Sequence, residues 1–137
     1  MKKFEEFIKD GKVVKMTPDY QQANSLFSNA KKRYEDLKSL PLNEENAPFR
    51  FESAYEVIRE AIQSFLSVEG YKPYSHEAIF AFALEQKLLD QFQSYQMDRY
   101  REIRNDINYR GERATIEEAK EIILFVKNIL LFLEKKR

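Results

Sequence analysis

Hydrophobic residues recur every three or four positions along most of the chain, which is the spacing of one face of an α-helix. The first long stretch predicts a helix that is capped by Thr17, has Pro18 at its first position and ends at Pro41. A second long helix is expected from about Pro48 to Gly70, because glycine readily takes the left-handed conformation in which helices end. Its buried stripe is expected to contain Phe51, Ala54, Tyr55, Ile58, Ala61, Ile62 and Phe65.

Three further helices are predicted in the second half of the chain. Ser75 can cap a helix that is apolar around most of its circumference, so this helix is expected to be central or partly buried against another subunit. A helix over roughly Ser94 to Tyr109 carries a narrower apolar seam. Thr115 and Glu118 form a capping box that opens the last helix.

The N-terminal segment is expected to be short and mixed. A short amphipathic helix is predicted over Lys2 to Lys9 and ends at Gly11, and the next residues form an extended link. No alternation typical of a strand, no internal repeat and no low-complexity tract is found. The sequence therefore predicts an all-α fold, an antiparallel up-down bundle of four to five main helices with a short N-terminal helix. We expect a single domain over 1–137, with the N-terminal helix and link in 1–16 and the bundle in 17–137.

The composition is that of a globular domain. Of the 137 residues, 43% are hydrophobic and 34% are charged. No apolar run approaches the roughly 20 residues that a membrane span requires, and the first residues lack the apolar core of a signal peptide. A cytoplasmic protein without a membrane partner is therefore predicted.

The composition also excludes several kinds of chemistry. The chain has no cysteine, which excludes disulfide scaffolds, thiolate nucleophiles and the common zinc sites. One histidine, His76, is too few for a site built from several histidines. The three glycines lie far apart, so no glycine-rich loop can cradle a phosphate. We predict no metal site and no cofactor.

Basic residues cluster locally although the formal net charge of the chain is zero. The segment Arg99 to Arg113 contains five arginines and three acidic residues. Within it, Arg104 shares the helix side of Ile103 and Ile107, so its guanidinium is expected at the edge of the core and needs a partner. Two interpretations follow: an internal ion pair with a glutamate of the acidic segment Asn43 to Glu69, or a bound phosphate.

Three segments resemble the HEPN family, the helical bundle family named for higher eukaryotes and prokaryotes nucleotide-binding. They are EGYKPYSHEA at 69–78, RYREIRNDINYRG at 99–111 and TIEEAKEIILFVKNIL at 115–130. HEPN members with ribonuclease activity carry an arginine, a polar residue directly after it and a histidine after four intervening residues. Arg104 and Asn105 match the first two places, whereas Tyr109 stands where the histidine is expected.

The resemblance implies a protein that binds a nucleotide or an RNA phosphate. Tyrosine, with an ordinary pKa near 10, is a poor base at neutral pH, although its hydroxyl can donate a hydrogen bond. The residues expected to bind the phosphate are Arg104, Asn105, Asn108, Arg101 and His76, with Tyr109 beside them. Because residues five apart on an ideal helix differ by about 140°, Arg104 and Tyr109 are expected to converge only if the helix end loosens or a second subunit completes the pocket.

Two alternatives stay open at this point. The first is a metal-independent endoribonuclease in which Arg104 and Tyr109 are catalytic, with Tyr109 or His76 replacing the usual histidine. The second is a non-catalytic protein-interaction module. The resemblance further implies a homodimer and a small nucleotidyltransferase as partner, in a system of the toxin–antitoxin type.

Overall fold

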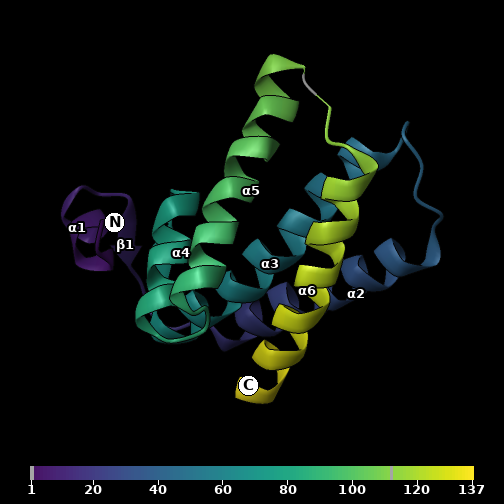
Figure 1. The fold of residues 1–137 in the computed structure, drawn as a ribbon. Helices are drawn as coiled ribbons and strands as arrows, with labels where there is room; N and C mark the ends of the chain where they lie inside the picture. The colour runs from purple at the N-terminus through teal and green to yellow at the C-terminus, as the bar shows by residue number, and fades with distance from the viewer. Residues whose placement is uncertain (1, 112) are drawn as a thin grey trace.

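The computed structural model describes residues 2–111 and 113–137, so Met1 and Glu112 lie outside the described residues. These residues form six helices and two short strands, and 74% of the chain is helical (Figure 1). The helices are α1 (Phe4–Lys9), α2 (Tyr20–Ser39), α3 (Ala47–Glu69), α4 (His76–Glu85), α5 (Gln91–Arg110) and α6 (Ile116–Lys136). The strands are β1 (Val13–Lys15) and β2 (Tyr71–Pro73). The predicted all-α helical bundle with a short N-terminal helix is therefore confirmed.

Helix α3 is the centre of the molecule. It packs most extensively against α2 and α6 and also contacts α4 and α5. Phe51, Tyr55 and Ile62 on its buried stripe have no exposed surface. Burying one side chain of this size contributes about 1.5–3 kcal/mol of transfer free energy, so α3 accounts for much of the core.

The apolar circumference of α4 is covered within this one chain. Its residues from Ala78 to Ala83 are all buried by the rest of the chain. Phe82 packs edge-on against Phe4 of α1 with ring centroids 5.2 Å apart, and Phe80 packs against Tyr55 of α3 at 5.9 Å. Of the two expectations for this helix, the structure shows the central position.

The two strands form an antiparallel pair that the sequence pattern did not predict. Val13 lies opposite Pro73 and Lys15 opposite Tyr71. Strands of three residues are too short to show an alternating pattern, so only the extended link before α2 and the break after α3 were predicted. The pair fixes the segment that leads from α3 into α4.

Helix α2 begins later than predicted. Its cap is Asp19, whose Oδ1 accepts a hydrogen bond from the Gln22 N–H at 2.9 Å, and Thr17 and Pro18 precede the helix. The reason is tertiary: the backbone N–H groups of Met16 and Asp19 donate to the carbonyls of Gly70 and Ser67 at the end of α3, both at 2.9 Å. These bonds keep residues 16–18 extended along α3, which delays the first helical turn.

Helix α5 projects beyond the bundle. Asp90 and Gln93 form a capping box that starts it three residues before the predicted Ser94. Its buried residues are Ser94, Met97 and Tyr100, all in the first half, and Gly111 ends it with a φ of +67°. Figure 1 shows the second half rising past the ends of the neighbouring helices. None of the helices in the described residues combines the length and apolar character needed to cross a membrane.

Candidate functional site

A hollow of about 250 Å³ lies between the start of α4 and the second half of α5. Its lining residues are Ser75, His76, Glu77, Arg101, Arg104, Asn105 and Tyr109. Five of the six residues predicted for the site therefore meet at one place, and they come from the consecutive helices α4 and α5. Asn108 is the exception: it is exposed and does not line the hollow.

Arg104 and Tyr109 border the same hollow although an ideal helix places them about 140° apart. Helix α5 stays regular through Arg110, and both residues line the hollow within a single chain. Arg101, Asn105 and Tyr109 lie four residues apart along one stripe, and Arg104 lies three residues after Arg101. Side chains at these positions border a common space along a regular helix, so the helix end is not loosened where the two residues line the hollow. Completion of the pocket by a second subunit stays a prediction.

The start of α4 supplies the other wall of the hollow. Ser75 caps this ten-residue helix, with its Oγ accepting a weak hydrogen bond from the Ala78 N–H at 3.4 Å. His76 and Glu77 form the first turn, at the positive end of the helix dipole. Antiparallel pairing of β2 with β1 holds the residues just before this turn.

The guanidinium of Arg104 is held by an aromatic ring rather than by a carboxylate. Its Cζ lies 5.6 Å from the centroid of the Tyr55 ring. Its Nε is buried and has no hydrogen-bond partner. Among the described residues no carboxylate lies within ion-pair distance of this side chain. The interpretation of Arg104 as half of an internal ion pair is therefore not what the described residues show.

Two of the four glutamates of α3 are paired with other arginines. Oε2 of Glu56 accepts two hydrogen bonds from Arg59, at 2.9 Å from Nε and 2.6 Å from Nη2. Glu60 is buried and accepts a hydrogen bond from Nε of Arg33 at 2.9 Å. Burial raises the pKa of Glu56, but the hydrogen bond and charge of Arg59 outweigh it, so the pKa is below its ordinary value. The carboxylate therefore stays ionised and stays with Arg59.

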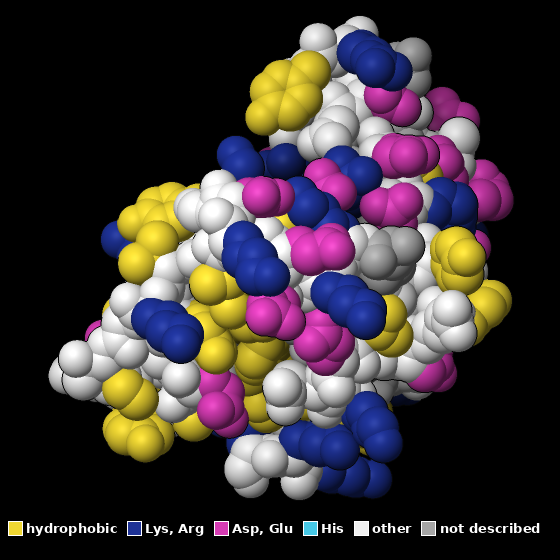
Figure 2. All heavy atoms as spheres, turned by 90° about the vertical axis from the view of Figure 1, so that its left-hand side faces the viewer, with side chains coloured by type: hydrophobic (Ala, Val, Ile, Leu, Met, Phe, Trp, Pro, Cys, Tyr) yellow, Lys and Arg dark blue, Asp and Glu magenta, His cyan; other side chains and the backbone are white. Residues whose placement is uncertain are grey.

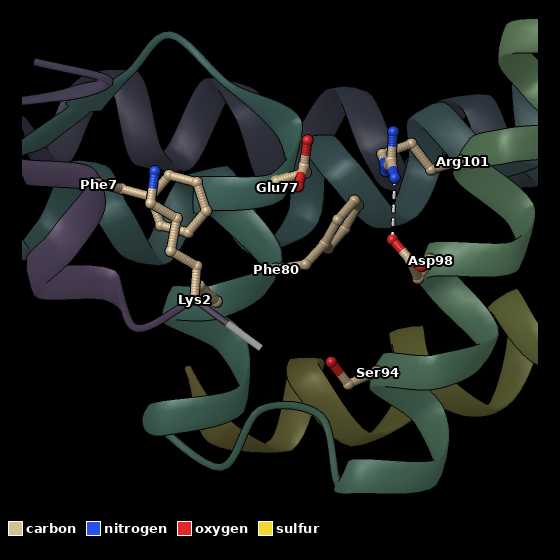
Figure 3. A pocket seen from close by; sticks show the side chains of 8 residues that line it. Lys2, Phe7, Glu77, Phe80, Ser94, Asp98 and Arg101 are labelled. Atoms are coloured by element: carbon tan, nitrogen blue, oxygen red, sulfur yellow. Dashed lines mark hydrogen bonds and ion pairs between the residues drawn. The ribbon is translucent and has the colours of Figure 1, made fainter. Parts of the chain in front are cut away.

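The guanidinium of Arg101 is only partly hydrogen-bonded. Its Nη2 donates to Asp98 Oδ1 at 3.0 Å, whereas its Nε is buried without a partner. Burial lowers the pKa of Arg101, but Asp98 and the charge of Glu77 more than compensate, so the net shift is upward and the guanidinium stays charged. Figure 3 shows this ion pair along α5, with Glu77 projecting from α4. Arg101 and Glu77 also border a neighbouring hollow of about 60 Å³, which has room for only a few water molecules.

His76 is half-buried and is within hydrogen-bond distance of the core residue Tyr55. Its Nδ1 lies 3.0 Å from the hydroxyl of Tyr55. Burial lowers the pKa of His76, and the charges of Arg59 and Arg104 lower it further. The imidazole is therefore neutral at pH 7. Helical periodicity predicts that Tyr55 is buried, but it does not predict that the Tyr55 ring and hydroxyl both contact site residues.

The positive charge of the hollow comes from its own lining residues. Its charged lining residues are two arginines and one glutamate, so it carries a single net positive charge while His76 is neutral. Elsewhere, basic and acidic side chains are interspersed over the face drawn in Figure 2. Attraction of an anion therefore depends on the few groups that line the hollow.

The arrangement offers donors and an exposed ring, but no cluster typical of a metal site. Within residues 2–111 and 113–137, no group of three or more histidine, cysteine, aspartate or glutamate side chains is placed to hold a metal ion. Two guanidinium groups, the Asn105 amide and the first turn of α4 provide donors. Tyr109, 79% exposed, provides a flat ring at the rim. Such a set suits an oxyanion attached to an aromatic group.

Comparison of the chain with protein-family models, with curated proteins and with solved structures finds no match. The resemblance to the HEPN family therefore remains a prediction from the three sequence segments.

Proposed function

We propose that the hollow binds the phosphate of a nucleotide or of RNA, with Arg104 as its principal ligand. The observation that carries this proposal is the guanidinium of Arg104, which lies at the edge of the core on the Tyr55 ring and is paired with no carboxylate of residues 2–111 and 113–137. A planar guanidinium offers two parallel N–H donors to an oxyanion. An anionic oxygen supplied by a ligand would provide the partner that the described residues do not.

Phosphate suits the hollow better than a carboxylate, because it presents more oxygens. Arg104 and Arg101 approach the hollow from α5, and the first-turn backbone N–H groups of α4 approach from the opposite wall. The exposed ring of Tyr109 is available to stack on a base. These features favour a nucleotide or a single-stranded RNA over inorganic phosphate.

The proposal includes the assembly that the HEPN resemblance implies. We infer a cytoplasmic homodimer that associates with a small nucleotidyltransferase in a system of the toxin–antitoxin type. The second half of α5 supports pairing, since Ile103 and Ile107 there are only partly buried.

Ribonuclease activity is the second candidate, and the geometry favours it less. Cleavage at a 2′-hydroxyl needs a proton acceptor, a proton donor and cationic stabilisation of the phosphate. Arg104 can provide the last. However, Nδ1 of His76 already has a hydrogen-bond partner in the Tyr55 hydroxyl. Tyrosine is protonated at neutral pH, so its hydroxyl donates a hydrogen bond but is a poor proton acceptor. Binding without cleavage is therefore our conclusion.

The proposal is tested by fluorescence anisotropy with a labelled single-stranded RNA and by competition with nucleoside monophosphates. The variant is Arg104→Ala. Its matched control is Arg110→Ala, which removes the same charge from an exposed side chain of the same helix that pairs with Asp106. A charge-assisted hydrogen bond contributes about 1.5–3 kcal/mol, so Arg104→Ala should weaken binding by about 10- to 100-fold.

The control should bind within about threefold of the wild type, since surface ion pairs contribute little. Equal affinities for the wild type and Arg104→Ala would contradict the proposal. The same samples, incubated with RNA and chelator, decide the second candidate: Arg104-dependent cleavage would establish a nuclease.

A further inference from the structure

Tyr55 is buried directly beneath the hollow and contacts two of its lining residues. Its ring lies under the guanidinium of Arg104, and its hydroxyl lies 3.0 Å from Nδ1 of His76. We propose that Tyr55 is a positioning residue that donates its hydroxyl hydrogen to Nδ1, which fixes His76 as the Nε2–H tautomer and presents that N–H to an anionic oxygen. The role assigned to the ligand rests on the proposed function, whereas the tautomer does not.

The position of Tyr55 is set by the core. It lies on α3 with no exposed surface, and its ring packs edge-on against Phe80 at 5.9 Å. A side chain enclosed in this way has one rotamer available, because the interior is packed at crystal-like density. The hydroxyl therefore points at the start of α4 whether or not a ligand is bound.

The direction of the hydrogen bond follows from what each group can offer. A buried hydroxyl that fails to donate loses about 1–3 kcal/mol. In the described part of the chain, Nδ1 of His76 is the acceptor within reach of this hydroxyl. Burial raises the pKa of Tyr55 well above its ordinary value, so the hydroxyl keeps its hydrogen. Nδ1 must then be unprotonated.

Burial and nearby charges keep the His76 ring neutral. Burial disfavours the imidazolium most, Arg59, Arg104 and Arg101 disfavour it further, and Glu56 favours it. A neutral imidazole with an unprotonated Nδ1 carries its single hydrogen on Nε2. His76 lines the hollow, so this N–H is available to a bound anion.

The tautomer determines whether His76 can donate or accept a proton at Nε2. With its hydrogen on Nε2, His76 donates to a phosphate oxygen but cannot accept a proton from a 2′-hydroxyl at that atom. Tyr55 supports Arg104 with its ring at the same time. One buried side chain therefore arranges two donors, one charged and one neutral, toward the same ligand.

The tautomer can be measured directly because His76 is the only histidine in the chain. Long-range ¹H–¹⁵N correlation spectra of uniformly labelled wild-type protein at pH 7 should show one imidazole with the pattern of the Nε2–H tautomer. A protonated ring or the Nδ1–H tautomer in the wild type would overturn the proposal. This measurement needs no ligand, so it stands even if the proposed function fails.

Tyr55→Phe removes the hydroxyl and keeps the ring beneath Arg104. We expect the His76 signals to shift toward a mixture of tautomers and the pKa of His76 to rise, because a hydrogen bond to the neutral form is lost. Tyr34→Phe on α2, remote from the hollow, is the control and should leave the signals unchanged. An unchanged spectrum in Tyr55→Phe would refute the positioning role, and if this variant does not fold, the wild-type spectrum decides.

The role of His76 in ligand binding is tested with variants of His76 and a labelled single-stranded RNA. His76→Gln places an amide N–H near the position of Nε2 and should bind within about threefold of the wild type. His76→Ala removes the donor and should bind about tenfold more weakly, since the bond is made to a charged acceptor. Equal binding by His76→Ala would remove His76 from the binding site, and absence of RNA binding by the wild type would refute the proposed function while leaving the tautomer result intact.

Discussion

At the scale of residues, the site depends on which acidic side chains the arginines of α2, α3 and α5 pair with. Glu56 is bound to Arg59, Asp98 to Arg101 and Glu60 to Arg33. These pairings leave Arg104 on an aromatic ring, with its Nε buried and unbonded. A donor without a partner destabilises the folded protein by about 1–3 kcal/mol, and evolution tolerates such a group where it serves binding.

Replacing this donor should therefore cost little stability. We predict that Arg104→Met changes the free energy of unfolding by less than about 1 kcal/mol, because methionine packs against the Tyr55 ring and leaves no acid unpaired. Urea denaturation followed by circular dichroism measures this change. A loss greater than about 2 kcal/mol would indicate that Arg104 has a partner within the folded chain.

The sequence identified Arg104 correctly as unusual, but it could not identify the surroundings of the guanidinium. Spacing places Arg104 on the side of Ile103, yet the choice of partner depends on how α3 is rotated and on which acids its own arginines take. The same limit applies to Tyr55. Its burial follows from helical periodicity, whereas the contacts of its hydroxyl and ring depend on α4 and α5, which lie at least 20 positions along the chain.

At the scale of elements, the connection between α3 and α4 positions one wall of the hollow. Gly70 ends α3 with a φ of +84°, and a Cβ there would lie 2.6 Å from the carbonyl oxygen of Met16. The following strand β2 leads directly to Ser75 and the first turn of α4. A change at Gly70 therefore affects both the fold and the hollow.

We predict that Gly70→Ala destabilises the protein by about 3 kcal/mol or more, because an unfavourable φ and a steric overlap add. Gly11→Ala is the matched control: Gly11 has a φ of +76° but open space around it, so its substitution should cost only about 1–2 kcal/mol. Thermal denaturation of both variants checks the difference. Equal losses would show that the approach of Met16 does not constrain this turn.

Arg33 of α2 and Glu60 of α3 form an ion pair, which leads to a second prediction at this scale. Glu60 is only 7% exposed, so removing its partner leaves a carboxylate poorly solvated. Arg33→Met should destabilise the protein by about 1–3 kcal/mol, and the double variant Arg33→Met with Glu60→Leu should recover most of the loss. Equilibrium unfolding of the three variants measures the coupling. A double variant as unstable as the single one would show that the helices need the charges themselves.

Most helices could be predicted because their signals are local. Caps at Ser75 and Thr115 and stops at Gly70 and Gly111 coincide with observed helix boundaries. The start of α2 was mispredicted because backbone bonds to the end of α3 override a favourable capping sequence. The strand pair was not predicted for the same reason, since its stability comes from contacts between residues 56 to 60 positions apart.

At the scale of the whole molecule, the balance of charge limits how a nucleic acid can be attracted. Lysine and arginine together equal aspartate and glutamate at 23 each, and the face in Figure 2 mixes both signs. We therefore expect RNA affinity to depend weakly on salt. One or two neutralised phosphates correspond to a slope of about −0.7 to −1.4 in log affinity against log salt concentration for a single strand.

Titration of labelled RNA at several potassium chloride concentrations gives this slope. A slope near −4 would instead indicate a broad basic surface, and the hollow would then be a minor part of the interface.

The central claim is that the unpaired guanidinium of Arg104 is reserved for the phosphate of a ligand. The most direct measurement is the dissociation constant of single-stranded RNA for the wild type beside Arg104→Met, on samples whose free energies of unfolding are determined in parallel. We predict that the variant binds at least about tenfold more weakly while its stability is unchanged. Equal binding by two equally stable proteins would contradict the account.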